Sequence, residues 1–215
     1  GLGDVYKRQP KKTLDAYRAK RGEFRILEVP LMQYLMVDGA GDPNSAQAYQ
    51  DAVSALFPVA YTLKFASRDQ LGIDTVVMPL EGQWHAPDME SFTSRRDKSA
   101  WEWTLMIMVP EHVTREMFDR AVDTVEEKLA KKKQASPALR SVRLETLDEG
   151  LCVQTLHVGS YDDEAPVLDE LHHRFIPENG LAMTGLHHEV YLSDVRRVDP
   201  SKLRTILRQP VERTG

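Results

Sequence analysis

The chain has 215 residues, 41% of them apolar and 28% charged, a composition typical of a globular protein with a substantial core. Its 28 basic and 33 acidic side chains give a net charge of −5, which argues against a general nucleic-acid binder. No apolar run approaches the roughly 20 residues of a membrane span, and the single cysteine, Cys152, excludes an intramolecular disulfide. We therefore expect a cytoplasmic protein with no direct nucleic-acid partner and no membrane partner.

Residues 1–9 read as a translated sequencing adapter rather than a natural start, and we exclude them from the fold. Residues 10–215 are interpreted as one domain. Its first strands are predicted at Phe24–Val29 and Leu31–Asp38, and the Gly- and Pro-rich segment 39–45 forms the turn that follows. This turn lacks the Lys-Ser/Thr pair of a phosphate-binding loop, so we interpret it as a plain turn.

A helix is predicted next, with Asn44 or Ser45 as its cap. Apolar residues then recur at helical spacing, as Tyr49, Val53, Leu56 and Ala60. Pro58 is expected to kink or interrupt this helix near Leu56–Phe57, because proline removes a helical hydrogen bond.

Two strands follow the helix in the sequence. Ile73–Leu80 is rich in β-branched residues and predicts a buried strand that is closed by 81–84. A polar loop is predicted from Trp84 to Asp97. Ala100–Val109 is the next strand, and its alternation places Trp101 and Trp103 on one face.

The second half begins with the clearest helix, 111–133, which ends in three lysines, favourable at a helix C-terminus. Val142–Leu147 and Leu151–Val158 predict a hairpin around the turn 148–150. A second amphipathic helix is predicted from Val167 to Phe175.

The last two strands are predicted at 186–194 and 203–211. Successive side chains of a strand point to opposite faces, so His187, Glu189 and Tyr191 share one face. The opposite face is the better candidate for the core. Glu189 is then an ordinary surface acid if its face meets water, and a candidate functional residue if that face lines a cleft.

The order of elements recurs, and this recurrence favours the cleft. Strand, glycine turn, capped helix and two strands appear over 24–110 and again over 142–211, joined by the helix 111–133. Glu81 of the first copy is set against Glu189 of the second. Joined, the two units form an α+β domain in which one antiparallel sheet has helices on one face. The other face is predicted to be a ligand groove at the pseudo-twofold seam.

The sequence also resembles the GyrI-like small-molecule-binding family over nearly everything after residue 9. The resemblance is carried by Val37–Asn44, Ala60–Phe65, Pro79–Trp84, Trp101–Thr104, His157–Asp162 and His187–Asp194. It implies a duplicated strand–helix–strand–strand (SHS2-type) fold. Relatives in that family include effector domains of multidrug-responsive transcription activators, a gyrase inhibitor, and stand-alone enzymes that hydrolyse the cyclopropane of DNA-alkylating natural products. No helix-turn-helix segment precedes the domain, so we expect the stand-alone type. Pro58 and Gln83 depart from the family pattern.

The resemblance implies catalytic roles for Glu189, Glu81 and Tyr191. Glu189 matches the groove glutamate that binds cations or serves acid–base chemistry, and we expect a raised pKa with Glu81 or Tyr191 assisting. Ligand contacts are expected from further residues, namely Tyr61, Trp84, Trp103, Met36 and His157. For His157 the sequence leaves a structural role open, in which its ring binds a backbone carbonyl.

Two functions therefore stay open. One is a hydrolase of strained, electrophilic xenobiotics, and the other is a non-catalytic module that sequesters flat, cationic molecules. Inhibition of a protein partner is a third and weaker interpretation. We expect no cofactor and no metal, because the adjacent pairs 172–173 and 187–188 direct their imidazoles apart. A homodimer is compatible with the sequence.

Overall fold

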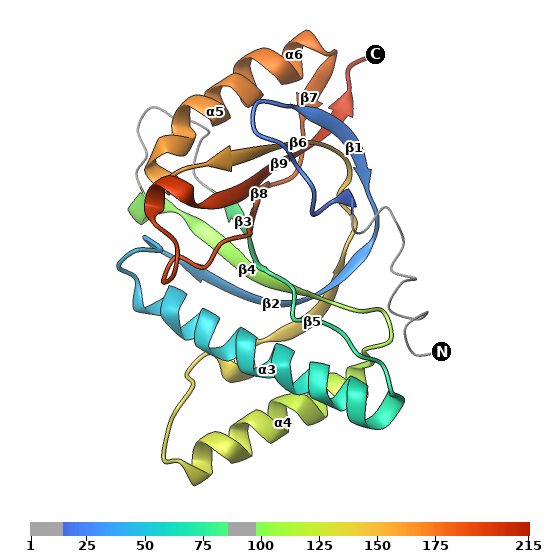
Figure 1. The fold of residues 1–215 in the computed structure, drawn as a ribbon, viewed down its shortest axis with the longest axis vertical. Coiled ribbons are helices and arrows are strands. Elements are labelled where there is room, and N and C mark those ends of the chain that lie inside the picture. The colour runs from blue at the N-terminus through green and yellow to red at the C-terminus, as the bar shows by residue number, and fades with distance from the viewer. Residues whose placement is uncertain (1–14, 86–97) are drawn as a thin grey trace.

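The computed structural model describes residues 15–85 and 98–215. Within these residues, nine strands form one antiparallel sheet in the order β1-β6-β9-β8-β3-β4-β2-β5, with β7 paired to β9 (Figure 1). The predicted α+β class with a large antiparallel sheet is confirmed. The predictions for residues 1–9 and for most of the loop 84–97 lie outside the described residues.

The strands are β1 (Arg25–Val29), β2 (Met32–Ala40), β3 (Leu80–His85), β4 (Glu102–Val109), β5 (Arg143–Leu147), β6 (Gly150–Val158), β7 (Leu181–Met183), β8 (His187–Tyr191) and β9 (Arg204–Arg213). The helical segments are α3 (Gln47–Leu71), η2 (Lys98–Ala100), α4 (Arg115–Lys131), η3 (Leu139–Ser141), η4 (Tyr161–Glu164), α5 (Ala165–Glu170), the π-helical turn η5 (Leu171–Phe175), α6 (Ile176–Glu178) and η6 (Pro200–Lys202). None of the described helices is long and apolar enough to cross a membrane.

Two long bent strands join the halves of the sheet. β1 and β2 have five and nine residues with a two-residue break, and β5 and β6 repeat these lengths. β1 pairs with β6 and β2 with β5 in one continuous antiparallel register that starts with Arg25 opposite Gln154. The predicted hairpin of 142–147 with 151–158 is therefore wrong, because neither strand pairs with the other. The connection between them is not a surface turn, since Glu149 lies inside the molecule.

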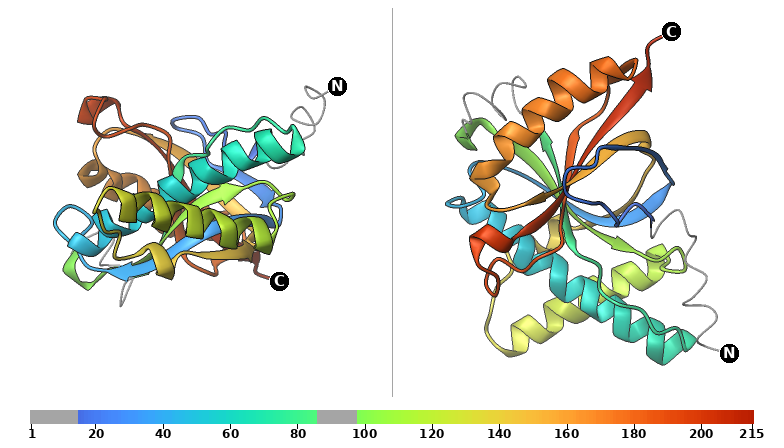
Figure 2. Two further views of the ribbon diagram at one scale, coloured as in Figure 1. Left: turned by 90° about the horizontal axis from the view of Figure 1, so that it is seen from below. Right: turned by 45° about the horizontal axis from the view of Figure 1, so that its top comes forward.

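The two faces of the curled sheet differ in what covers them (Figures 1 and 2). α3 and α4 pack against β2 and β4, and α5 with η5 and α6 packs against β6 and β9, all on one face. The concave face is filled by buried side chains, among them Tyr34, Met106, Met108 and Cys152, and by Ala16 from the segment before β1. The centre of this face is therefore filled, and the hollow of about 550 Å³ on it lies to one side, over β2, β3 and β4.

The first helix is longer and starts later than predicted. The residue before α3 is Ala46, which makes no side-chain cap, and the helix continues through Pro58 to Leu71. The predicted interruption at Pro58 is wrong, because the helix is held from both sides of that residue by packing on the sheet. Gly72 ends the helix with φ of 65°, a left-handed conformation that favours glycine.

The strand predicted at Ile73–Leu80 is displaced along the chain. Residues 73–79 pair with no strand, and β3 occupies Leu80–His85. Val77 and Met78 still pack against the core. Their β-branched, apolar composition therefore reports burial rather than strand pairing.

Candidate functional site

A pocket of about 360 Å³ lies on the helix-covered face, above β3 and β8 where the two repeats meet. Its sides come from the start of α3, from η4 and α5, and from the segment between β8 and β9. The lining side chains are Pro43, Asn44, Tyr49, Trp84, Lys98, Trp101, Ser160, Tyr161, Asp162, Glu164, Leu168, His187, Glu189, Tyr191, Val195, Pro200 and Leu203. The hollow thus forms at the predicted seam but on the opposite face of the sheet.

The floor of this pocket is the face of β8 that carries His187, Glu189 and Tyr191. Nε2 of His187 lies 2.6 Å from Oε2 of Glu189, and the Tyr191 hydroxyl donates to Oε1 at 3.1 Å. From β3, the indole N–H of Trp84 donates to the Tyr191 hydroxyl at 2.9 Å. Glu189 is 7% exposed, so these contacts fix a carboxylate that is largely withdrawn from water.

A second carboxyl group lines the same pocket. Glu164 ends η4, is 3% exposed, and shares a hydrogen bond with Glu189. A hydrogen bond between two carboxyl groups requires one proton. The floor therefore holds two carboxyl groups in contact, and one proton can be shared between them.

The pKa of Glu189 is lowered from its ordinary value. Burial acts to raise it, but the hydrogen bond and charge of His187, followed by hydrogen bonds from Glu164 and Tyr191, outweigh burial. The raised pKa predicted from the sequence is therefore wrong, because the neighbours of this carboxylate are hydrogen-bond donors. Glu189 is ionised at neutral pH.

Aromatic rings form the walls of the pocket. Trp84 and Trp101 meet edge to face with ring centroids 5.5 Å apart, and Tyr161 meets Tyr191 in the same way at 5.7 Å. Burial, followed by the charge of Glu189, raises the pKa of Tyr49 to about 12, so its phenol is neutral. Rings around a buried carboxylate suit a flat molecule with a positive or electron-poor centre.

Glu81 lies on the opposite face of the sheet from Glu189. β3 and β8 pair Glu81 with Val190 and Gly82 with Glu189. Counted along the pairings from the start of β2 and of β6, Gly82 is the position equivalent to Glu189, and His188 is equivalent to Glu81. The sequence alignment of the repeats is therefore off by one residue, and a slip of one moves a side chain to the other face. The structure contradicts the placement of Glu81 beside Glu189.

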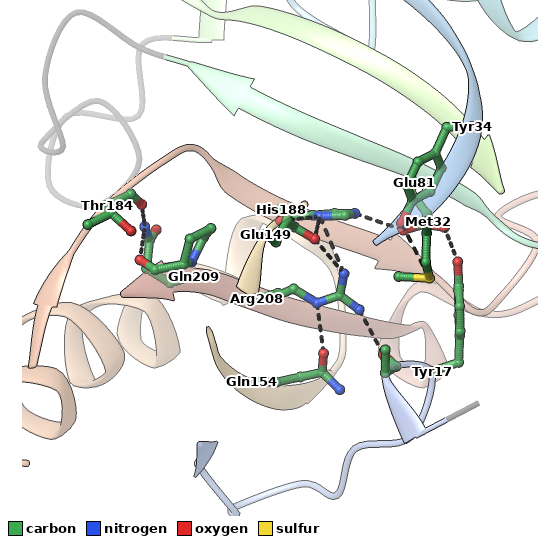
Figure 3. Close-up of polar contacts among 12 residues, drawn as sticks. Tyr17, Met32, Tyr34, Glu81, Glu149, Gln154, Thr184, His188, Arg208 and Gln209 are labelled. Carbon is green, nitrogen blue, oxygen red and sulfur yellow. Dashed lines mark hydrogen bonds and ion pairs between the residues drawn. The ribbon is translucent and has the colours of Figure 1, made fainter. Parts of the chain in front are cut away.

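Glu81 belongs instead to a buried charge network on the concave face (Figure 3). Nε2 of His188 lies 2.8 Å from Glu81, and Nδ1 lies 2.8 Å from Glu149. Arg208 donates to Glu149 at 2.9 Å, and the Tyr17 hydroxyl donates to Glu81 at 2.5 Å. Two carboxylates, a guanidinium and an imidazole thus meet without access to water, since all of these side chains except Tyr17 are 3% exposed or less.

The charges of this network shift its pKa values in opposite directions. Burial acts to lower the pKa of His188, but the charge of Glu149 outweighs burial and raises this pKa to about 9. Burial acts to raise the pKa of Glu149, but His188 and then Arg208 lower that pKa to about 2. His188, Glu149 and Arg208 are therefore charged at neutral pH.

Of the five predicted ligand contacts, only Trp84 lines the pocket. The other four lie outside it, namely Tyr61, Trp103, Met36 and His157. Tyr61 is half exposed on the outer side of α3. Trp103 packs in the core beneath Gly39, and Met36 lies on the concave face. Strand alternation placed Trp103 correctly relative to Trp101, but only the earlier residue reaches the hollow.

His157 takes the structural role that the sequence left open. Its Nε2 donates to the carbonyl oxygen of Ser160 at 2.8 Å, and the ring is buried. This contact fixes the turn after β6. Tyr161 and Glu164 follow that turn directly, so His157 helps to place two residues of the pocket.

Sequence reasoning missed four lining residues, Tyr49, Trp101, Tyr161 and Glu164. Tyr49 was assigned to the apolar stripe of a helix, and Glu164 was given no role. Glu164 in fact makes no capping hydrogen bond to α5. An acidic residue at the start of a helix that makes no capping hydrogen bond to that helix is a candidate for a role in the pocket.

No group of three or more His, Cys, Asp or Glu side chains in the described ranges is arranged to hold a metal ion. Cys152 lies on the concave face, where burial first, and then the charge of Glu149, raises the pKa of its thiol to about 12. A thiol with such a pKa is not a nucleophile at neutral pH.

Comparison with known proteins matches residues 22–212 to the GyrI-like small molecule binding domain. The chain is 38% identical to an uncharacterized conserved protein from Listeria innocua, with a TM-score of 0.81 over 94% of this chain and 98% of that one. It is 37% identical to a hydrolase from Listeria innocua, with a TM-score of 0.76 and the same coverage. The EcmrR C-terminal domain, at 12% identity and a TM-score of 0.54 over 89% of this chain and 98% of that one, shares the fold. No curated protein sequence matches the chain significantly.

Proposed function

Because this chain belongs to the GyrI-like small-molecule-binding domain family, we propose that its pocket binds flat, electrophilic xenobiotics and hydrolyses a strained ring in them. The observation that carries the proposal is the contact between the carboxyl groups of Glu164 and Glu189 under aromatic walls. We assign the proton of this pair to Glu164, because the donors around Glu189 favour its ionised form. A similar protein from Listeria innocua bears the name hydrolase, which supports the catalytic interpretation.

The chemistry adds one water molecule across a strained carbon–carbon bond, as in an activated cyclopropane. Glu189 accepts a proton from the water, and the oxygen of that water forms a bond to a ring carbon. The ring bond breaks, and its electron pair moves onto a conjugated acceptor such as a carbonyl group. Glu164 gives that acceptor its proton. The hydrogen bond between the two carboxyl groups then returns the proton from Glu189 to Glu164.

The walls supply binding and orientation. Trp84, Trp101 and Tyr161 offer ring faces and edges to a planar substrate. A pocket of about 360 Å³ is of the size that holds a drug-like ring system. Exclusion of bulk water strengthens the interaction of the carboxylate with an electron-poor carbon.

The test is incubation of the purified protein with a cyclopropane-bearing DNA-alkylating compound, followed by chromatographic detection of the hydrated product. We expect turnover in the native protein and a fall of at least about a hundredfold in Glu189→Gln, which cannot accept the proton. Glu102→Gln changes an exposed acid outside the pocket and is the matched control. Full turnover by Glu189→Gln would refute the assignment of the base.

A second function is favoured by the charge of the same carboxylate. An ionised Glu189 beside rings is a partner for a flat organic cation, held by charge and cation–π attraction. Tight binding of such a cation by calorimetry, with no product from any cyclopropane substrate, would assign the protein to sequestration instead of hydrolysis.

A further inference from the structure

We propose that His172 is a positioning residue for the carboxylate pair. Through a water molecule enclosed between two imidazole rings, it holds His187 in the orientation in which Nε2–H donates to Glu189. Its predicted effect on rate rests on the hydrolytic function proposed above. The hydrogen-bonded state of His187 does not, since it can be measured without a substrate.

His172 points inward because the helix changes its period there. α5 passes into η5, a π-helical turn over Leu171–Phe175, before α6 begins. Such turns are rare and are found frequently at functional sites. His172 is buried in this turn, whereas the next residue, His173, is exposed and faces Asp169.

The ring of His172 is polar, buried and unpaired. It is 3% exposed, and neither ring nitrogen has a hydrogen-bond partner among the described residues. Burial first, and then the neighbouring His187, lowers the pKa of His172 to about 3, so the ring is neutral. A neutral imidazole has one donor and one acceptor nitrogen. Buried polar atoms of this kind are satisfied by ordered water when no protein group is in reach.

The distance to His187 fits one such water. The ring centroids of His172 and His187 lie 6.3 Å apart, with the planes at 87°. A water that makes two hydrogen bonds of about 2.9 Å joins nitrogens roughly 5 Å apart, a separation that rings with these centroids can present. Nδ1 of His187 is itself a buried atom, so a water between the rings is shielded from exchange with the pocket.

The consequence reaches the carboxylate pair through His187. An ionised Glu189 accepts hydrogen bonds and donates none, so the 2.6 Å contact requires the proton on Nε2 of His187. An imidazole fixed through its second nitrogen keeps one orientation. His172 therefore acts on Glu189 without touching either the substrate or the carboxylate.

The test uses ¹⁵N-histidine NMR of the full chain. In the native protein we expect the ring nitrogens of His187 to report a protonated Nε2, and a nuclear Overhauser contact between the His172 ring and a slowly exchanging water. His172→Phe keeps the ring shape but removes both nitrogens, and it should shift the His187 signals. His172→Gln keeps a donor and an acceptor and should restore them, at least in part. His173→Phe is the matched control on the exposed neighbour and should change nothing.

In the turnover assay His172→Phe should lower kcat by roughly tenfold to a hundredfold with little change in KM, because a displaced base misorients the attacking water. Unchanged His187 signals in folded His172→Phe would overturn the proposal and leave His172 as a space filler. If that variant does not fold, the native spectrum decides: a rapidly averaging His187 ring and no retained water also overturn the proposal. Changed His187 signals in a protein that never turns over a substrate would refute the hydrolytic function alone.

Discussion

Two neighbouring residues of β8 place the same pair of groups on opposite faces of one sheet. His187 meets Glu189 in the pocket, and His188 meets Glu81 in the concave interior. In the interior every charge is matched, because Glu149 and Arg208 complete the network and no hollow lines it among the pockets described above. In the pocket the carboxylate faces a second acid and a cavity. A cavity beside the buried charge, rather than the charge itself, distinguishes a candidate binding site from a charge network that only stabilises the fold.

The largest effect is expected from breaking the interior network. Arg208→Met removes a fully buried cation and leaves Glu149 and Glu81 with His188 as their shared counter-charge. Removal of one partner of a buried ion pair typically destabilises by about 3–5 kcal/mol. Urea unfolding followed by circular dichroism measures the change. A loss below about 1 kcal/mol would mean that the network does not hold the two halves of the sheet together.

The pH dependence of stability separates the two regions next. The pKa of His188 is raised to about 9, so its contribution is fully present below about pH 6.5 and is lost as the pH rises through 9. The pKa of Glu189 is lowered, so its contribution is present above about pH 4.3 and is lost as the pH falls. We expect His188→Gln to reduce the loss of unfolding free energy at alkaline pH, and Glu189→Gln to reduce the loss at acid pH. Unfolding free energies measured from pH 3 to 10 test both, and exchanged effects would contradict the assignment.

A smaller effect is expected at the position equivalent to Glu189 in the first repeat. A Cβ on Gly82 would lie 2.8 Å from the indole nitrogen of Trp84. Gly82→Ala should therefore push the indole away from Tyr191 and loosen one wall, with ligand affinity reduced by about tenfold and a destabilisation of about 1 kcal/mol. Calorimetric titration measures the affinity. Gly150→Ala, at a left-handed glycine far from the pocket, should destabilise without changing affinity.

Local patterns of the sequence predicted the parts of the fold that depend on neighbours along the chain. The alternation of residues 186–194 placed Glu189 and Tyr191 on one face correctly, and the apolar stripe of 111–133 predicted α4. Pairing between repeats was not accessible in this way. No pattern of neighbouring residues indicates that β5 pairs with β2 instead of β6, and the predicted hairpin was therefore wrong.

Only the site residues on β8, in the second repeat, were predictable from the sequence. Glu81 was assigned to the wrong face because the true counterpart of Glu189 is Gly82, which has no side chain to mark the register. Glu164 escaped because an acid before a helix is usually a cap. The lowered pKa of Glu189 depends on donors from β8 and η4, which come together only in the folded chain.

The most direct test is a crystal structure of Glu189→Gln with an intact cyclopropane-bearing substrate bound. The account predicts the planar ring system between Trp84, Trp101 and Tyr161, with the strained carbon facing residue 189 and the conjugated acceptor facing Glu164. Density for the substrate in another hollow, or in this pocket with its strained ring turned away from both carboxyl positions, would contradict it.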